Sequence, residues 1–430
     1  MTERLIIKNF VGIKDLEIEV KKINILIGPQ ASGKSICAKL LFYFKNFPWD
    51  IISAVENVDT KRKFDSTYSQ KFIEYFSPDS WGNNEFLIRY ELYNMFIEVK
   101  RLNGNNKNKI LITYADSYNQ ELLKLRKVLN EFRETNTTKN IRYEQIIMGV
   151  STVRGNLSRH LSQSLCKEAS FTQLFVPAGR SFFANLQNNI FSFLHTSNAI
   201  DPFLKVFGST YESVKMLKID TLHSLINLEH LDKKNILYEM IELVEKALCG
   251  KYLRYKGRDY IETIDHRRVS LSNASSGQQE TLPLLLILTT LPFLVEAATG
   301  RTVYIEEPEA HLFPQAQKSI TELIATVFNY HEDKLQFFIT THSPYTLTAF
   351  NNLLQAGILY KELDAEHLEE LEKIVPRYKA LSTDDFSAYA LADGKCTSII
   401  NPETGLIDAT IIDAVSEDLM IEFDNLLNLI

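Results

Sequence analysis

The stretch that decides the fold is INILIGPQASGKS, residues 23–35. Its first five residues, Ile23 to Ile27, form a short apolar run of the kind found in strands that are buried on both faces. The next eight, Gly28 to Ser35, fit the pattern G-x-x-x-x-G-K-[ST]. Residues 36–44 then carry apolar residues at helical spacing. A strand, a glycine-containing loop and a helix in this order are the context that a phosphate-binding loop requires.

Each part of this loop has a chemical role. Its backbone N–H groups wrap a β-phosphate, and the two glycines allow the close approach that this needs. Lys34 reaches the β- and γ-phosphates, Ser35 places its hydroxyl on Mg²⁺, and the helix that begins here adds its positive dipole end. A chance match has a probability on the order of one per cent in a chain of this length, so we predict nucleotide binding. The predicted nucleotide-binding residues are Gly28, Pro29, Gln30, Ala31, Ser32, Gly33, Lys34, Ser35 and Ile36.

Composition places the chain among ordinary soluble globular proteins. It has 430 residues, 45% apolar and 23% charged, which rules out a disordered, collagen-like or disulfide-stapled chain. Lys and Arg total 47 against 54 Asp and Glu, a formal net charge of −7. A broadly basic nucleic-acid coat is therefore excluded, although a local basic patch is not. Only 16 glycines are present, which gives weight to the two in the phosphate loop.

Neither the cysteines nor the N-terminus indicates export. The cysteines are Cys37, Cys166, Cys249 and Cys396. They lie too far apart in sequence for a zinc or redox motif, so we expect reduced thiols in a cytoplasmic protein. No basic segment followed by an apolar core opens the chain, and no signal peptide is predicted. Residues 281–299 approach the length of a membrane span but contain two prolines and Glu296, so we predict a buried core helix and no membrane contact.

Strand and helix patterns divide the chain into three segments. Residues 1–45 and 261–430 carry the strands and helices expected of an α/β core. Residues 46–260 show three strand patterns between 85 and 115, with a hairpin signal at 103–106, and then mostly helical patterns. We predict an α/β fold of the P-loop NTPase type, interrupted by an antiparallel β subdomain and a mostly helical insertion.

A second motif ends an apolar strand with acidic residues, VYIEEPE at residues 303–309. Glu306 would hold Mg²⁺, usually through water, and Glu307 would orient and deprotonate an attacking water molecule. The alternative is a solvated acidic turn, which acidic clusters usually form. The phosphate loop favours the first interpretation, because nucleotide hydrolysis with Mg²⁺ needs a carboxylate at a neighbouring strand end.

Two further polar segments each have a structural and a functional interpretation. ASSGQQE, residues 274–280, precedes the long apolar helix. A Ser and a Gly at a helix N-terminus can form an anion site, but Ser followed by Gln or Glu is also a capping signature. THSP, residues 341–344, follows another strand. His342 there would contact a γ-phosphate or the attacking water, or it would occupy a turn capped by Ser343.

Taken in order, these motifs resemble those of one ATPase class. GPQASGKS resembles a Walker A motif, VYIEEPE a Walker B motif with its following glutamate, and ASSGQ the LSGGQ signature. Residues 310–312, AHL, lie where that class has its D-loop, and THS resembles its switch-histidine motif. The opening LIIKNFVGIKDLEIEVKKINILIGP is similar to the N-terminal strands of the RecF, SMC and OLD groups. The chain thus resembles the bacterial OLD-like and RecF-like AAA-family ATPases, which have an ABC-type ATPase head, over residues 1–45 and 265–350.

The resemblance implies ATP hydrolysis, with ATP and Mg²⁺ as cofactors. Two copies would sandwich ATP head to tail, as a homodimer or within a higher oligomer. Catalysis would depend on Lys34, Glu307 and His342, and Mg²⁺ would be held by Ser35 and Glu306. The signature residues that would complete the γ-phosphate site of the other copy are Ser275, Ser276, Gly277 and Gln278.

The chain also departs from the family pattern. Its signature reads SSGQ and not SGGQ, so Ser276 brings a side chain to the second position. The Walker B acid is Glu306 in place of Asp, which would shift the Mg²⁺ geometry slightly. Gln173 is the best candidate for the glutamine of a Q-loop. Arg180 would approach a phosphate or a neighbouring subunit, or else form a structural salt bridge.

The leading hypothesis for the function is a cytoplasmic ATPase that switches its assembly state and controls a separately encoded effector, a nuclease or toxin. The family, and not the residues, implies a role in anti-phage defence. We do not expect an OLD-type nuclease, because its TOPRIM domain needs a D-x-D pair that the sequence lacks, or a transporter subunit, because residues 45–260 are too long an insertion. The alternative is an SMC- or RecF-like DNA-binding ATPase in repair or maintenance. Basic stretches at Lys100–Lys109 and Lys251–Arg268 would contact nucleic acid in that case, or would be solvated hairpin faces.

Overall fold

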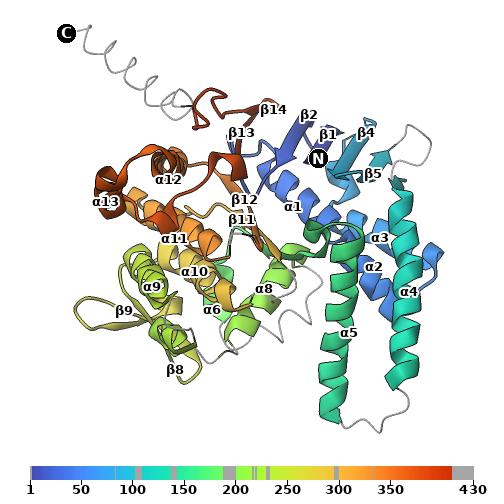
Figure 1. The fold of residues 1–430 in the computed structure, drawn as a ribbon, viewed down its shortest axis with the longest axis horizontal. Helices are drawn as coiled ribbons and strands as arrows, with labels where there is room; N and C mark the ends of the chain where they lie inside the picture. Colours follow the sequence, from blue (N-terminus) through green and yellow to red (C-terminus); the bar gives the residue numbers. More distant parts are fainter. Residues whose placement is uncertain are drawn as a thin grey trace.

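One large sheet organises the molecule (Figure 1). The computed structural model describes residues 2–82, 84–101, 109–136, 143–186, 200–215, 217, 220–228, 233–294, 300–331 and 333–408. Within these residues, eleven strands join in the order β6-β5-β4-β1-β2-β14-β13-β3-β12-β11-β7. Their bounds are β1 (Glu3–Phe10), β2 (Ile13–Val20), β3 (Ile23–Ile27), β4 (Phe86–Leu92), β5 (Met95–Arg101), β6 (Leu111–Tyr114), β7 (Thr172–Val176), β11 (Arg301–Glu306), β12 (Leu335–Thr341), β13 (Phe386–Ala392) and β14 (Lys395–Ser398). The predicted α/β class is confirmed.

The sheet has a parallel half and an antiparallel half. Strands β13, β3, β12, β11 and β7 run parallel to one another, whereas β2, β1, β4, β5 and β6 are antiparallel neighbours. Strand β14 connects the halves, because it pairs with both β13 and β2. The strands between 85 and 115 do not form the separate small sheet that we expected. They extend the core sheet, because β4 pairs with β1 from Glu3 opposite Leu92 onward.

Helices cover both faces of this sheet (Figure 1). Their bounds are α1 (Lys34–Lys45), α2 (Phe47–Glu56), α3 (Lys61–Tyr75), α4 (Asp116–Asn136), α5 (Tyr143–Ser164), α6 (Phe182–Leu186), α8 (Pro202–Lys215), α9 (Lys234–Leu248), α10 (Ser276–Leu294), α11 (Pro314–Tyr330), α12 (Pro344–Glu362) and α13 (Ala365–Ile374). Helices α4 and α5 lie side by side and project from the sheet as a pair (Figure 1). A second sheet holds β10 (Arg268–Ser270), β9 (Arg258–Glu262) and β8 (Lys251–Tyr255). The hairpin signal at 103–106 lies outside the described residues, and the limits of the three predicted segments stay a prediction.

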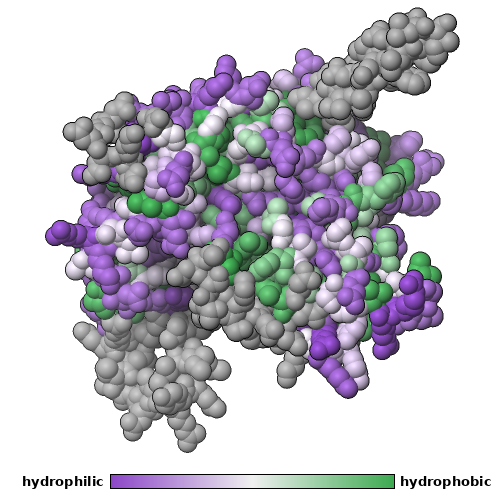
Figure 2. Space-filling model, turned by 180° about the vertical axis from the view of Figure 1, so that it is seen from behind, coloured by the Kyte–Doolittle hydropathy of each residue, from purple (hydrophilic) through white to green (hydrophobic). Residues whose placement is uncertain are grey.

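Alternate residues of the parallel strands enter two separate cores. On β11, Val303 and Ile305 belong to the core that contains α9 to α12, whereas Tyr304 belongs to the core that contains α1 to α5. The Tyr304 ring meets Phe42 of α1 edge-on, with 5.7 Å between centroids. This alternation explains why these strands read as continuous apolar runs, since both of their faces are covered. Figure 2 shows the face opposite to that of Figure 1, where hydrophilic residues predominate and hydrophobic ones form small separate groups.

The long apolar segment at 281–299 is a core helix, as predicted, over the part of it that the structure describes. Its described part lies in α10, where residues such as Leu285 and Leu288 have no exposed surface. Residues 295–299 lie outside the described range. Across the described chain, none of the helices combines the length and the apolar character that crossing a membrane requires.

A buried carboxylate ties the start of the chain to three other elements. Glu3, on β1, accepts a hydrogen bond from the ammonium of Lys45 at the end of α1 (2.6 Å). The same oxygen accepts from the hydroxyl of Tyr90 on β4 (2.9 Å), and the other oxygen accepts from Gln336 on β12 (3.1 Å). The side chains of Glu3 and Lys45 are only 6% and 2% exposed. Glu3 thus joins both halves of the sheet to the helix that follows the phosphate loop.

Replacing Glu3 should therefore destabilise the whole fold. Glu3→Ala leaves the Lys45 ammonium buried without its partner, a change that costs about 3–5 kcal/mol. Chemical denaturation of the variant measures this loss. Glu17→Ala is the control, because Glu17 and its partner Arg4 are largely exposed and such a pair contributes at most about 1 kcal/mol. Equal losses in the two variants would contradict the anchoring role of Glu3.

Candidate nucleotide-binding site

The phosphate loop connects β3 to α1 and needs both of its glycines. A Cβ atom at Gly28 would lie 2.1 Å from the backbone oxygen of Leu391 on β13. Gly33 has a φ of +103°, which side chains disfavour, and a Cβ atom there would lie 2.8 Å from Ile13 on β2. Close packing against β13 and β2 therefore fixes the path of the loop.

Lys34 is the first residue of α1, and its side chain turns back over the loop. Its ammonium donates to the carbonyl oxygens of Gly28 (2.7 Å) and Pro29 (2.8 Å), and it lies 3.4 Å from Nδ1 of His342. Burial lowers the pKa of this amine, while the carboxylate of Glu307 acts in the opposite direction. Charged oxygens are stronger partners for an ammonium than carbonyl oxygens. Lys34 is thus placed to exchange these carbonyls for phosphate oxygens.

Glu306 ends β11 as a buried carboxyl group, 5% exposed. Its Oε2 accepts a hydrogen bond from the N–H of Ala178 (3.2 Å), whereas its Oε1 is buried without a hydrogen-bond partner. Burial raises the pKa of this group, although the charge of Lys39 and the hydroxyl of Ser35 partly oppose that effect. The hydroxyl of Thr340, whose residue lies opposite Glu306 on β12, also has no partner.

These oxygens fit the predicted magnesium site. Mg²⁺ prefers oxygen ligands, keeps several waters, and is usually held by one or two protein groups together with substrate phosphates. Ser35 and Glu306 offer a hydroxyl and a carboxylate of this kind, and a hydrogen bond from the Ser35 hydroxyl lowers the pKa of Glu306 against the effect of burial. Among the described residues, no group of three or more His, Cys, Asp or Glu side chains is arranged to hold a metal ion. The phosphates of a bound nucleotide would therefore have to supply further ligands.

Glu307 and His342 meet at the same edge of the sheet. Nε2 of His342 lies 3.1 Å from Oε1 of Glu307, while Nδ1 faces Lys34. The tautomer that carries its proton on Nε2 satisfies both contacts, because Nε2–H donates to the carboxylate and Nδ1 accepts from the ammonium. The side chains of His342 and Glu307 are 32% and 37% exposed, so water reaches both of them.

The backbone of Glu307 adopts an unusual conformation. Its φ is +45°, a left-handed value that is strained for a residue with a side chain. Its N–H donates to the carbonyl of Thr340 (2.9 Å), and its carbonyl accepts from Ala310 N–H (3.1 Å) and from Arg180 Nη2 (3.1 Å). Hydrogen bonds to both the N–H and the carbonyl of Glu307 keep its backbone in this strained conformation.

Glu309 is a further site residue, to which the sequence analysis gave no role. Its Oε1 accepts from the hydroxyl of Thr341 (2.8 Å) and from the N–H of His342 (2.6 Å), and its Oε2 is buried without a hydrogen-bond partner. Glu309 therefore holds the segment that carries the histidine. In the sequence, this role could have been suspected only because Glu309 is the third acidic residue of the E-E-P-E run.

The signature segment begins α10 as a helix cap. Ser275 Oγ accepts from the N–H of Gln278 (3.3 Å), and Gln278 Oε1 accepts from the N–H of Ser275 (3.2 Å). Such reciprocal bonds form a capping box, so the capping interpretation is confirmed and the contact with nucleotide stays a prediction. Ser275 and Ser276 are exposed, whereas Gly277 is buried against the D-loop, where a Cβ atom would lie 2.7 Å from the carbonyl oxygen of His311.

The structure resolves the open interpretations of Arg180 and Gln173. Arg180 is completely buried and pairs with Glu280, so the structural salt bridge is the correct interpretation. Gln173 lies within β7 and accepts a hydrogen bond from the hydroxyl of Tyr304 (2.7 Å). The Q-loop assignment is wrong, because this side chain is held three residues before the end of the strand. The loop after β7, residues 177–181, contains Ala178 and thus contacts the carboxylate of Glu306 directly.

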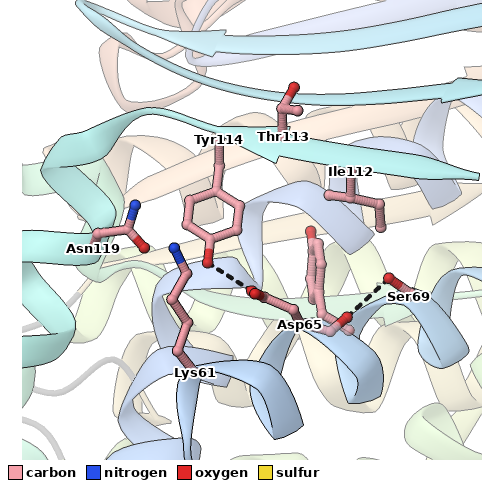
Figure 3. Close-up of a pocket in the computed structure, with 8 residues that line it drawn as sticks. Lys61, Asp65, Ser69, Ile112, Thr113, Tyr114 and Asn119 are labelled. Atoms are coloured by element: carbon pink, nitrogen blue, oxygen red, sulfur yellow. Dashed lines mark hydrogen bonds between the residues drawn. The ribbon is translucent and has the colours of Figure 1, made fainter.

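A separate cavity of about 270 Å³ lies between α3 and β6 (Figure 3). The hydroxyl of Tyr114 donates to Asp65 across it (2.7 Å), and Ser69 donates to the backbone carbonyl of Asp65 (2.8 Å). The lining residues include none of those predicted from the motifs, so this cavity is distinct from the nucleotide-binding site.

Comparison with known proteins supports an ATPase domain in this chain. Residues 179–347 match a family model described as the AAA ATPase domain, and this range includes the signature segment, Glu306, Glu307 and His342. No curated protein matches the chain. Similar solved structures include the Smc head domain of Pyrococcus furiosus bound to the C-terminal domain of ScpA (12% identity, covering 97% of this chain and 98% of that chain, TM-score 0.38). Two others are the SMC head domain of Thermotoga maritima (11%, 93% and 98%, TM-score 0.34) and the recombination mediator RecF with ATPγS (13%, 93% and 98%, TM-score 0.29).

Glu306→Gln should stabilise the protein without ligand and abolish its response to magnesium. The pKa of Glu306 is higher in the folded protein than in the unfolded chain. The unfolded chain therefore loses its proton first as the pH rises, and the wild type loses stability between the unfolded and the folded pKa. The variant lacks this loss, so its melting temperature should exceed that of the wild type at pH 8 and approach it at pH 5. With ATP present, added Mg²⁺ should raise the melting temperature of the wild type but not of the variant.

Thermal melts at both pH values, with and without ATP and Mg²⁺, measure these effects. Glu17→Gln, an exposed carboxylate outside the site, is the control and should behave as the wild type. A Glu306→Gln protein that responds to Mg²⁺ like the wild type would contradict the metal assignment.

Proposed function

We propose that this chain binds ATP with Mg²⁺ and hydrolyses it, and that two copies close around the nucleotide to form an ABC-class switch. The observation that supports this most directly is the row of contacts from Lys34 through His342 to Glu307. These three residues lie in the segments that follow three neighbouring parallel strands, with Lys34 as the first residue of α1. A phosphate-binding lysine, a histidine and a partly exposed carboxylate in one row match the requirements for activating water beside a γ-phosphate.

In this proposal each side chain has a separate task. Lys34 binds the β- and γ-phosphate oxygens in place of the carbonyls of the loop. Glu307 accepts a hydrogen bond from the attacking water and takes its proton as the water oxygen bonds to the γ-phosphorus. The bond from that phosphorus to the β,γ-bridging oxygen breaks, and ADP leaves with the electron pair. His342 donates from Nε2 to Glu307 and so orients the carboxylate. Ser35 and Glu306 would hold Mg²⁺, which would supply positive charge to neutralise the phosphates.

The exposed start of α10 supports closure of two copies. Ser275 and Ser276 present a hydroxyl-rich helix N-terminus to solvent, and such a terminus favours anions. In a head-to-tail dimer it would contact the γ-phosphate held by Lys34 of the other copy. ATP would then join the copies, and its hydrolysis would release them.

We further propose that this assembly cycle acts in the cytoplasm and controls a separately encoded effector, a nuclease or toxin, in anti-phage defence. The resemblance to OLD-like ATPases supports this role. The identity of the neighbouring gene and co-purification of its product with the chain test it.

Nucleic-acid binding is the second candidate function, and the β8–β9 ribbon favours it. Lys251, Lys256 and Arg258 are exposed there and form no ion pair within the described part of the chain. Arg267 and Arg268 of the same basic stretch pair with Asp265 and Glu262, and Lys100 of the other stretch pairs with Glu98. Binding to duplex DNA that weakens steeply with salt and requires ATP would favour this function.

Glu307→Gln should retain ATP binding and accumulate the ATP-bound dimer. Removal of a general base lowers turnover by about 10²–10⁴-fold, while the phosphate loop is unchanged. Phosphate release and size-exclusion chromatography with ATP and Mg²⁺ measure the two effects. Lys34→Ala is the matched control, because it should bind no ATP and stay dissociated. Wild-type turnover in Glu307→Gln would show that another group is the base.

Ser275→Arg should separate nucleotide binding from association. The long side chain occupies the exposed helix N-terminus that would meet the phosphate of the other copy, but it lies outside the phosphate loop. ATP binding should therefore match that of the wild type, while ATP-dependent dimers disappear. Ser272→Arg, at an exposed position three residues earlier, is the control for added charge and size and should still dimerise.

A further inference from the structure

The Arg180 guanidinium bonds to the backbone of the two adjacent glutamates at the strand end of the Walker B segment, Glu306 and Glu307. Its Nη1 donates to the carbonyl of Glu306 (2.7 Å) and to that of Pro177 (3.1 Å), and its Nη2 donates to the carbonyl of Glu307 (3.1 Å). The side chain has no exposed surface. Arg180 therefore holds the strained backbone of the proposed general base without reaching the reacting atoms.

Glu280 attaches the same arginine to the signature helix. It lies on α10, four residues after the first residue of the helix, and is 2% exposed. Its Oε1 accepts from the N–H of Arg180 (2.9 Å), and its Oε2 accepts from the N–H of Ser181 (2.8 Å). Arg180 Nε donates in turn to the carbonyl of Glu280 (3.1 Å).

Glu280 is held in its charged form. Burial alone would raise the pKa of Glu280, but the charge of Arg180 and the bonds from the N–H groups of Ser181 and Arg180 outweigh it and lower that pKa. Six hydrogen bonds hold this buried pair, three between residues 180–181 and Glu280 and three from Arg180 to the carbonyls of Pro177, Glu306 and Glu307. Breaking the pair would leave an uncompensated buried charge, so the two segments are held firmly together. The contact of Gly277 with the carbonyl of His311 links the same two segments a second time.

We infer that Arg180 and Glu280 are positioning residues that couple the two ATP sites of a dimer. The inference rests on the proposed function. In a head-to-tail dimer, the signature helix of one copy contacts the ATP of the other copy, whereas Glu307 acts on the ATP of its own copy. The pair connects these two groups within one chain. Engagement of α10 by the ATP of the partner therefore sets the backbone of Glu307, and hydrolysis at one site depends on occupation of the other.

The test compares Glu280→Gln and Arg180→Lys with the wild type. Glu280→Gln keeps the shape and one acceptor oxygen but removes the charge opposite Arg180. Arg180→Lys keeps the charge but loses the planar fork that reaches several carbonyls at once. Hydrolysis measured over a range of ATP concentrations should give a Hill coefficient near 2 for the wild type, the number of coupled sites, and near 1 for both variants.

The rate and the binding step provide independent readouts. Misplacement of Glu307 should lower kcat on the order of tenfold to a hundredfold, while binding of a fluorescent ATP analogue to the monomer is unchanged. Glu322→Gln is the matched control, because it removes one carboxylate from the ion pairs of Lys379, another buried group outside the site (2.9 Å). It should lower the melting temperature and leave the Hill coefficient at the wild-type value.

The outcomes distinguish the coupling from the proposed function. Variants with reduced kcat and a Hill coefficient near 2 would overturn the coupling and leave the ATPase proposal intact, as would a wild type that hydrolyses ATP with a Hill coefficient of 1. A wild type that neither binds nor hydrolyses ATP would refute the proposed function itself. If Glu280→Gln does not fold, Arg180→Lys tests the coupling alone, since it leaves no buried carboxylate without a cation.

Discussion

The shared register of β3, β12 and β11 is the constraint on which the site depends. Thr341 lies opposite Ile27, and Thr340 lies opposite Glu306, so three parallel strands end at nearly the same level. The phosphate loop, His342 and Glu307 follow directly after these ends. A shift of one residue in any pair would turn every side chain of that strand to the other face and remove its last residues from this edge. Backbone pairing therefore brings the proposed catalytic groups together, and side-chain hydrogen bonds then fix their positions.

Local pattern was sufficient to predict the elements around the phosphate loop, because strand, glycine turns and helix each leave a short-range signal there. Pairing between distant segments leaves no such signal. Nothing in the sequence of residues 86–101 indicates that β4 pairs with β1 and so extends the core sheet. The same limit explains the wrong assignment of Gln173 to a Q-loop. The sequence pattern predicted the strand that contains Gln173, but only the structure shows that its side chain bonds to the hydroxyl of Tyr304.

The sequence also does not indicate which charged groups are buried. Burial in different surroundings shifts the pKa values of Glu280 and Glu306 in opposite directions. Glu280 faces a guanidinium that belongs to a residue 100 positions away, and its pKa is lowered. Glu306 is also buried, but the charge of Lys39 and the hydrogen bonds from Ser35 and Ala178 offset the effect of burial only in part, and its pKa is raised. Glu280 is therefore a fixed structural anion. Glu306, whose charge is incompletely compensated by the protein, gains from a divalent cation placed beside it.

The same geometry accounts for the departures from the family motifs. Ser276 is exposed at the first position of α10, so a side chain at the second position of the signature meets no steric barrier within the chain. The third position does need glycine, since Gly277 lies against the carbonyl of His311. At the Walker B position, Glu306 uses one oxygen to accept a hydrogen bond from the N–H of Ala178, whereas its other oxygen is buried without a hydrogen-bond partner. One carboxylate oxygen of Glu306 thus bonds to the loop after β7, and the other stays available for the Mg²⁺ of the proposed function.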